Sequence, residues 1–219
     1  GWCTLSDYYD KFSDTDERRG IYYNYPADTT SNRTKEFKRQ NVGFFAGQQY
    51  NWSTNKPLMA RNPANAPLVF TREVTIRTSG ATLETAGIRP MKYAFDYAVT
   101  GQRNNDWVVF RYADVLLMQA EAILRGGTGT ATEALGLVNT IRTNRGVNNL
   151  TALTLDNLLD ERARELYWEG WRRQDLIRFG KFLLAWQEKA ADADPKTLVY
   201  PIPSQQIAVN PNLKQNTGY

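Results

Sequence analysis

The sequence changes character near Asp106, and this change constrains the fold more than any other feature. Residues 1–105 are crowded with Asn, Thr, Pro, Gly and Tyr and lack sustained periodicity, which is typical of loops with short strands. From Asp106 onward the chain is rich in Ala, Leu, Glu and Arg, the composition of helices. We therefore expect a mainly α fold that combines a loop-rich, short-stranded part (1–105) with a helical scaffold and a closing extended tail (106–219).

The loop-rich part contains two candidate strands. Residues 68–71 and 74–77 carry β-branched and aromatic side chains, and Ser79-Gly80 follows the second stretch as a turn. Residues 62–67 contain two prolines, each of which restricts its own backbone and that of the residue before it. We expect a loop there.

The helical part opens with a predicted helix hairpin. A first helix over 107–125 would end at Gly126-Gly127, because glycine accepts the left-handed conformation of a helix C-cap. Thr130 and Glu133 form a capping box at the start of a second helix, which Gly146 would end. The pair is an αα-hairpin of tetratricopeptide type, although no second copy follows. The predicted inward side chains are Ala113, Leu116, Leu117, Ala120, Leu124, Ala134, Leu135, Val138 and Ile141.

A third helix is expected from about Leu155 to Glu169, and a fourth apolar stretch continues to Leu184. The chain then becomes extended at 200–203 and ends with a turn at 210–213. The inward side chains of the third helix are expected to be Leu158, Leu159, Ala163, Leu166 and Tyr167.

The residue counts exclude several kinds of chemistry. The 219 residues contain no histidine, which removes Ser-His-Asp and Cys-His catalysis and every imidazole metal site. The single cysteine, Cys3, can close no internal disulfide and build no thiolate metal site. We expect no cofactor and no bound metal. Apolar runs such as 115–118 are far shorter than the ~20 residues that cross a bilayer, so we expect no transmembrane helix.

The densest charge lies in the predicted third helix. Glu161, Glu165 and Glu169 are spaced four apart and share one helical face, which is suitable for a hard metal ion or for acid–base chemistry. At least as many cations lie within reach, and arginine–carboxylate pairs stabilise helix junctions. We therefore favour a structural ion-pair network. Its cations are expected to be Arg162, Arg164, Arg172 and Arg173.

Two further binding functions are disfavoured. The glycine-rich segment 126–130 precedes a helix but lacks the Gly-Lys-Ser/Thr ending of a phosphate-binding loop, so it reads as a helix connection. No basic run exceeds two residues, and acidic neighbours offset most arginines. We do not expect the chain to bind nucleic acid.

Five stretches resemble the SusD/RagB family of surface glycan-binding lipoproteins. They are 111–122 (RYADVLLMQAEA), 139–146 (NTIRTNRG), 161–179 (ERARELYWEGWRRQDLIRF), 200–203 (YPIP) and 210–219 (NPNLKQNTGY). Residues 13–19 and 89–93 also fit. The matching segments run through nearly the whole chain.

The resemblance implies a non-catalytic protein at the surface of the Gram-negative outer membrane. Such a protein binds an oligosaccharide or polysaccharide and delivers it to a TonB-dependent, SusC-like transporter. Family members are about twice this length and begin with a lipidated cysteine and helical repeats. We therefore expect that this chain is the C-terminal half only, that the missing half packs on the helix pair at 107–146, and that a lipid anchor on the missing half is the only membrane attachment.

Two alternatives stay open. The same fold can capture peptides or glycoproteins, and a carboxylate-dependent glycoside hydrolase would use one of Glu161, Glu165 or Glu169.

The ligand-contacting residues are predicted from local chemistry alone, because the family motifs mark scaffold and not site. Aromatic rings beside amide groups suit a sugar, whose CH faces stack on rings while its hydroxyls form hydrogen bonds. The alternative is that these tyrosines cover the core of the loop-rich part. Trp107, Trp168, Trp171 and Trp186 lie in predicted helical segments and are expected to be structural. The predicted ligand-binding residues are Tyr23, Tyr25, Tyr50, Asn51 and Trp52, with Trp2 and Tyr8 in reserve.

Overall fold

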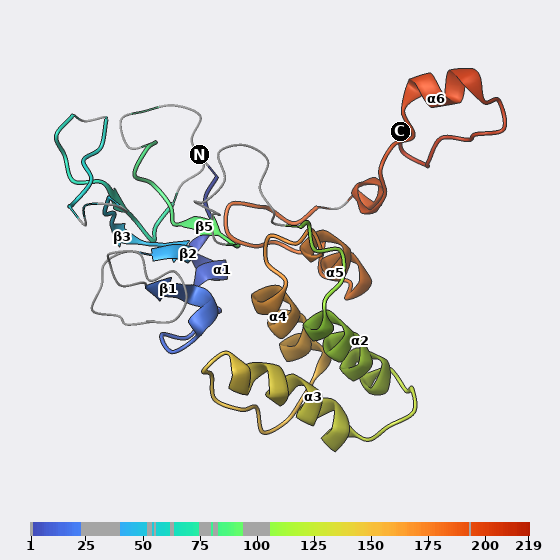
Figure 1. Cartoon of the computed structure of the whole chain (residues 1–219). Coiled ribbons are helices and arrows are strands. Elements are labelled where there is room, and N and C mark those ends of the chain that lie inside the picture. The colour runs from blue at the N-terminus through green and yellow to red at the C-terminus, as the bar shows by residue number, and fades with distance from the viewer. Residues whose placement is uncertain are drawn as a thin grey trace. The chain divides into compact units, whose positions relative to one another are not determined.

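The computed structural model divides into two compact units, Gly1–Arg172 and Arg173–Tyr219. Figure 1 shows the strands and the helices of the mainly α fold that the sequence predicts. In the described part of the chain, every helix is too short or too polar to span a bilayer. The described residues are 2–22, 40–51, 54, 56–61, 64–74, 80, 83–93, 106–192 and 194–219.

Short strands form two small antiparallel sheets in the first unit. The central strand of the larger sheet is β2, and β1 and β5 flank it. Two short elements, helix α1 and the 3₁₀ turn η1, precede these strands in the chain. The elements are α1 (Ser6–Tyr9), η1 (Glu17–Arg19), β1 (Gly20–Tyr22), β2 (Gln40–Phe45), β3 (Gly47–Gln48), β4 (Val69–Phe70) and β5 (Arg89–Met91).

The strand prediction was only partly right. The strand expected at 68–71 is confirmed as β4, which pairs with β3, whereas the one expected at 74–77 falls mostly outside the described residues. Strand β2 was not predicted, because Gly43 lies in its middle and glycine disfavours a strand. A side chain at Gly43 would come within 2.6 Å of the Arg19 carbonyl oxygen, and its φ is +93°. Glycine therefore marks the close approach of β1 and not a loop.

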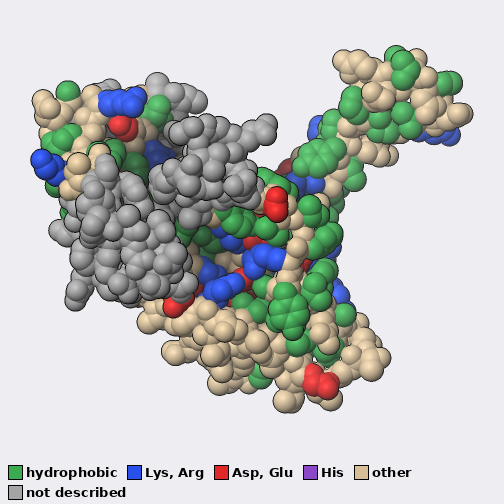
Figure 2. Space-filling model, viewed as in Figure 1, with side chains coloured by type: hydrophobic (Ala, Val, Ile, Leu, Met, Phe, Trp, Pro, Cys, Tyr) green, Lys and Arg blue, Asp and Glu red, His purple; other side chains and the backbone are tan. Residues whose placement is uncertain are grey.

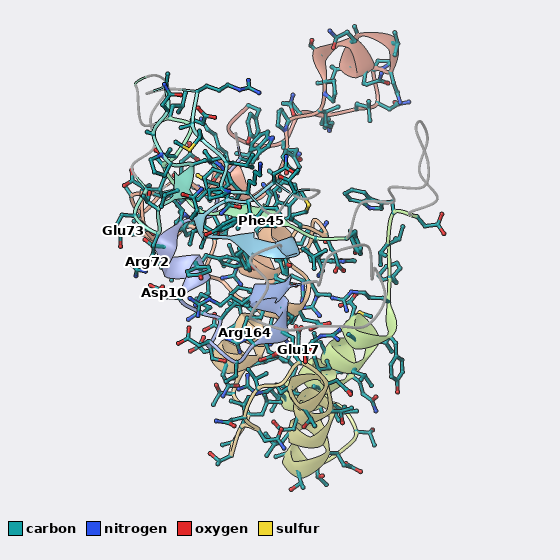
Figure 3. All side chains as sticks on the ribbon, turned by 60° about the vertical axis from the view of Figure 1, so that its left-hand side comes forward. Asp10, Glu17, Phe45, Arg72, Glu73 and Arg164 are labelled. Carbon is teal, nitrogen blue, oxygen red and sulfur yellow. The ribbon has the colours of Figure 1, made fainter. Side chains whose placement is uncertain are left out.

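An exposed ion-pair group connects two segments of this unit. Arg72, which follows β4, donates from Nε to Asp10 at the end of α1 over 2.9 Å. The same guanidinium donates from Nη1 to its neighbour Glu73 over 2.7 Å, as Figure 3 shows. Because these side chains are largely exposed, solvent screens the ion pairs and the group contributes little to stability.

The predicted helix hairpin is confirmed as α2 (Tyr112–Leu124) and α3 (Ala131–Asn144). At the end of α2 the amide of Gly127 donates to the Ala122 carbonyl over 2.8 Å, and Gly126 has a φ of +97°. This pattern is a Schellman cap. The predicted capping box is also present, since the Thr130 hydroxyl accepts from the Glu133 amide and the Glu133 carboxylate accepts from the Thr130 amide.

Helices α2, α3 and α4 (Leu155–Glu165) bury the main hydrophobic core of the first unit (Figure 1). The small residues Ala120 and Ala134 are fully buried and allow α2 and α3 to pack closely. A second cluster joins the strands to the end of α4 and consists of Tyr9, Phe12, Phe44, Ile88 and Tyr167. The core residues predicted from α4, among them Leu158 and Ala163, are confirmed as buried.

Two predicted helix boundaries were wrong. The helix expected from 107 begins at Tyr112, and the preceding residue, Arg111, has an extended backbone (φ −143°, ψ 163°). Trp107 is therefore neither helical nor structural, and 76% of it is exposed. The helix expected to reach 169 ends at Glu165. Trp168 has a φ of +61°, a left-handed backbone that cannot continue a right-handed helix.

The second unit has its own short helices. α5 (Arg172–Arg178) starts at the boundary between the units, and η2 (Pro195–Leu198) and α6 (Ser204–Val209) follow. The tail was expected to be extended at 200–203 but becomes helical directly afterwards in α6. The turn predicted at 210–213 is confirmed, since the Leu213 amide donates to the Asn210 carbonyl over 3.1 Å. Arg173 lies over the Tyr200 ring at 4.1 Å and connects the start of this unit to the segment after η2.

The burial pattern of α2 predicts that truncating two neighbouring side chains changes the free energy of unfolding by very different amounts. Leu117 is fully buried, so Leu117→Ala should lower the free energy of unfolding by about 2–5 kcal/mol through lost burial and a cavity. Met118 is 39% exposed, so Met118→Ala should cost less than ~1 kcal/mol. Urea unfolding followed by circular dichroism measures both values. Similar losses in the two variants would contradict the placement of α2.

Candidate functional site

Three buried glutamates organise the charged centre of the first unit. Glu161 and Glu165 lie on α4, and Glu169 follows this helix. Their side chains are 2% exposed or less. Cationic side chains from four other segments surround them. We call this group the arginine–glutamate lattice: Glu161, Glu165, Glu169, Arg18, Lys92, Arg111, Arg142, Arg145 and Arg164.

Glu161 binds three guanidinium groups. Its Oε1 accepts from Arg18 of η1 at 2.7 Å, and its Oε2 accepts from Arg142 of α3 and Arg164 of α4, each at 2.6 Å. Although burial raises the pKa of Glu161, Arg18 and Arg164 outweigh this effect and lower it. The carboxylate is therefore ionised at neutral pH.

Glu165 also binds three arginines. Arg111 donates to Oε1 at 2.6 Å, Arg145 donates to both oxygens at 2.7 and 3.1 Å, and Arg18 donates to Oε2 at 3.0 Å. Burial raises the pKa of Glu165, but the hydrogen bonds from Arg145 and Arg111 outweigh it and hold this pKa at about 2.

Glu169 connects the lattice to the chain after β5. Arg111 donates from Nε to both Glu169 oxygens at 3.0 Å, and Lys92 donates to Oε1. The Lys92 ammonium also lies 4.6 Å from the centre of the Tyr167 ring. Burial lowers the pKa of Lys92 to about 8, although Glu169 opposes the shift.

The predicted ion-pair network is confirmed, but most of its partners differ from the expected ones. Arg164 belongs to the lattice, whereas Arg162 pairs with Asp114 of α2 at 2.9 Å. Arg172 and Arg173 donate to main-chain carbonyl groups. The missed partners come from segments distant in sequence, which a helical spacing rule cannot find. Within the described residues, no group of three or more His, Cys, Asp or Glu side chains could hold a metal ion.

Two of the predicted ligand-binding residues lie on a short hairpin. Tyr50 forms an isolated bridge with Pro57, and the Asn51 amide donates to the Lys56 carbonyl over 2.8 Å. The Asn51 side chain accepts from the Thr54 amide at 2.9 Å. The hydrogen bond between Asn51 and Lys56 therefore holds the two ends of the segment 51–56 next to each other. Three other predicted residues lie outside the described residues: Tyr23, Tyr25 and Trp52.

The reserve residues occupy different surroundings. Trp2 is 83% exposed, and its ring is open to a ligand. Tyr8 packs edge-on against Phe12 and Phe44, and its hydroxyl donates to the Ala163 carbonyl at 2.6 Å. Burial raises the pKa of Tyr8. Of the two, the geometry favours Trp2 as a stacking surface.

Sequence reasoning missed the residues that line the hollow beside the lattice. A cavity of about 370 Å³ is lined by Lys92, Tyr93, Arg111 and Arg145, among others. Arg111 and Arg145 were visible in the stretches 111–122 and 139–146, but those stretches were interpreted as scaffold. Lys92 and Tyr93 were likewise visible in the stretch 89–93, which fits the same family but was not interpreted as a site.

The chain was compared with known protein families and with known proteins. The model of the SusD family matches residues 1–219, and the chain belongs to the SusD family. A curated relative is the starch-binding protein SusD of Bacteroides thetaiotaomicron, which is 39% identical over 125 residues. That match covers 53% of this chain and 22% of the relative. The aligned part of this chain thus spans less than a quarter of the relative's length.

Solved structures support the fold. The crystal structure of a SusD superfamily protein from Parabacteroides distasonis matches with a TM-score of 0.61 at 21% identity, over 99% of this chain and 42% of that chain. A SusD-like protein from Bacteroides fragilis matches with a TM-score of 0.60 at 21% identity, over 99% of this chain and 47% of that chain.

The lattice predicts a specific acid sensitivity. Glu165 protonates near pH 2 in the folded chain but near its usual value of 4.5 in the unfolded chain. Between these values the unfolded state binds more protons, so the free energy of unfolding falls as the pH drops from 4.5 to 2, by roughly 3 kcal/mol for this group. Denaturant unfolding at a series of pH values measures this slope.

The control uses two substitutions. Glu165→Gln should remove this part of the slope and destabilise the chain at neutral pH, because it leaves buried guanidinium groups without their shared partner. Glu188→Gln changes an exposed glutamate and should leave the slope intact. A full slope in Glu165→Gln would mean that the lattice does not carry this acid sensitivity.

Proposed function

We propose that this chain is a non-catalytic glycan-binding part of a cell-surface protein of the outer membrane. In this proposal it holds an oligosaccharide or polysaccharide and delivers it to a TonB-dependent, SusC-like transporter. The observation that carries the proposal is the match of the SusD family model over residues 1–219. The starch-binding role named for its relative SusD supports a glycan as the ligand.

The electrostatics of the lattice support binding over catalysis. A glycoside hydrolase needs a carboxylic acid whose pKa is raised so that it can donate a proton to the leaving group. The pKa values of Glu161 and Glu165 are both lowered, and arginines occupy both carboxylates. Neither group is suited to act as a general acid. The lattice therefore supports a structural role for the very glutamates that the hydrolase alternative would use.

The proposed glycan site is the aromatic surface of the loop-rich part. Tyr50 and Asn51 lie at the base of a hairpin whose two arms are hydrogen-bonded, so a ligand that contacts them meets a fixed backbone. The amide group of Asn51 and the rings of its neighbours offer the two kinds of contact that a sugar needs. We propose the set Tyr23, Tyr25, Tyr50, Asn51 and Trp52, with Trp2 as a further stacking surface.

Trp52→Ala tests the ligand surface. The change should weaken the binding of a matching oligosaccharide roughly three- to tenfold, because it removes one stacking ring. Trp107→Ala is the matched control, since Trp107 is also an exposed tryptophan but lies outside the proposed set. A glycan array identifies the oligosaccharide, and isothermal titration calorimetry measures the affinities.

Three outcomes would contradict the proposal. If Trp52→Ala binds as tightly as the parent, Trp52 is not part of the site. If a peptide panel binds and the glycan array does not, the ligand class is wrong. Turnover of a chromogenic glycoside that is lost in Glu165→Gln, in protein shown to be folded, would establish the hydrolase instead.

A further inference from the structure

Two adjoining hollows in the first unit form a continuous depression that we call the basic groove. They share three lining residues: Arg111, Asn144 and Arg145. The first hollow, of about 370 Å³, extends to Tyr93. The second, of about 450 Å³, lies between the start of α2 and the end of α3 and extends to Tyr112. In Figure 2, basic side chains gather in this central part of the visible face.

The charge of the basic groove is positive. Four basic and three acidic side chains line the first hollow, and the charged residues of the second are Arg111 and Arg145, which are two of those four. Low-dielectric walls strengthen the potential of such an excess, so the groove favours an anionic group. The charged lining residues are Arg18, Lys92, Arg111, Arg145, Glu17, Glu165 and Glu169.

Arg145 is the residue best placed to receive that anion. A guanidinium group has five N–H donors. Glu165 accepts from Nε at 3.1 Å and from Nη2 at 2.7 Å, which occupies one side of the group. Among the described residues Nη1 has no hydrogen-bond partner, and the side chain is 37% exposed. The second fork, formed by Nη1 and Nη2, is therefore open, while the first holds the side chain in place.

The other lining groups fit a sugar. Asn144 donates from Nδ2 to the Thr140 carbonyl at 2.9 Å, and its Oδ1 has no partner among the described residues, so it can accept from a sugar hydroxyl. Tyr112 is 75% exposed at one end of the groove. Tyr93 is partly exposed at the other end and has a φ of +67°, a strained backbone for a bulky residue. Each of the two hollows is thus lined by one exposed tyrosine as well as by Arg145.

We propose that the basic groove binds a carboxylate-bearing sugar residue, and that Arg145 donates two parallel hydrogen bonds to its carboxylate. Bidentate arginine–carboxylate pairs are strong and directional, which would let the groove select an acidic unit among neutral ones. This inference rests on the proposed glycan-binding function and extends it, because the groove lies apart from the hairpin at Tyr50 and Asn51 in sequence and lining.

The test compares trigalacturonic acid with the same trisaccharide after reduction of its carboxyl groups. Calorimetry of the parent chain at low ionic strength should show at least tenfold tighter binding of the acidic form. Added salt should narrow this preference, because the contact is partly exposed. Equal affinities for the two forms would overturn the inference and leave the proposed function standing, provided that a neutral glycan binds.

Two variants test whether the preference for the acidic trisaccharide arises in the basic groove. Arg145→Gln should abolish it, so that the acidic and the reduced trisaccharide bind this variant with similar affinity. Because Arg145 also pairs with Glu165, thermal unfolding must show that this variant is folded. Asn144 makes no hydrogen bond to any lattice residue that the structure describes, so Asn144→Asp leaves the lattice intact. This variant should also abolish the preference, since the new carboxylate repels the ligand and competes for Arg145. If either folded variant keeps the full preference, the site assignment is wrong.

Matched controls separate the groove from general charge effects. Arg125→Gln removes the same charge from a similarly exposed arginine that pairs with Glu121 at the other end of α2, and it should keep the preference. An acidic hexapeptide rich in glutamate should bind at least tenfold more weakly than trigalacturonic acid. Equal binding of this peptide would overturn the sugar class, and failure of every glycan to bind would overturn the proposed function as well.

Discussion

The fold of the first unit depends on Glu165 and its arginine partners being brought together. Neither the carboxylate nor a guanidinium group can be buried cheaply without an opposite charge beside it. Arg18 comes from η1, Arg111 precedes α2, and Arg145 follows α3, yet all three meet one carboxylate on α4. Removing one partner from such a buried group leaves an uncompensated charge, which typically costs several kcal/mol. We therefore expect η1, the start of α2 and the end of α3 to detach from α4 in one step and not one at a time.

The lattice and the hydrophobic core have different roles. The apolar side chains of α2, α3 and α4 supply the main favourable free energy, because burial of apolar area outweighs other terms. Buried ion pairs contribute little net stability relative to apolar replacements. We infer that the lattice instead selects one arrangement of the strands on the helices. Lys92 illustrates this role, since its contacts with Glu169 and Tyr167 place the chain after β5 against the end of α4.

The sequence predicted those features that depend on residues close together in the chain. The Schellman cap at Gly126 and the capping box at Thr130 set the ends of the helix hairpin, and both were visible in the sequence. Strand β2 was not visible, because the requirement for Gly43 comes from Gly20 and Arg19 across the sheet. The lattice shows the same limit: the spacing of the glutamates predicted ion pairs on α4, but Arg18 and Arg111 arrive from distant segments. The site prediction had no comparable signal, since aromatic loops favour stacking without fixing which ring is exposed.

The same charge arrangement supports the proposed binding role over the hydrolase alternative. Catalysis by carboxylates needs one group that holds its proton near neutral pH, and such a group needs burial without cationic partners. Here each lattice glutamate is buried with at least two cations. At Glu161 and Glu165 the cations outweigh the effect of burial, so the pKa of each carboxyl is lowered and its proton is lost. What this arrangement provides is a guanidinium group, that of Arg145, which Glu165 holds in place while Nη1 has no hydrogen-bond partner among the described residues. Fixed donors recognise an anion without a change of protonation, so they can hold a ligand and release it chemically unchanged.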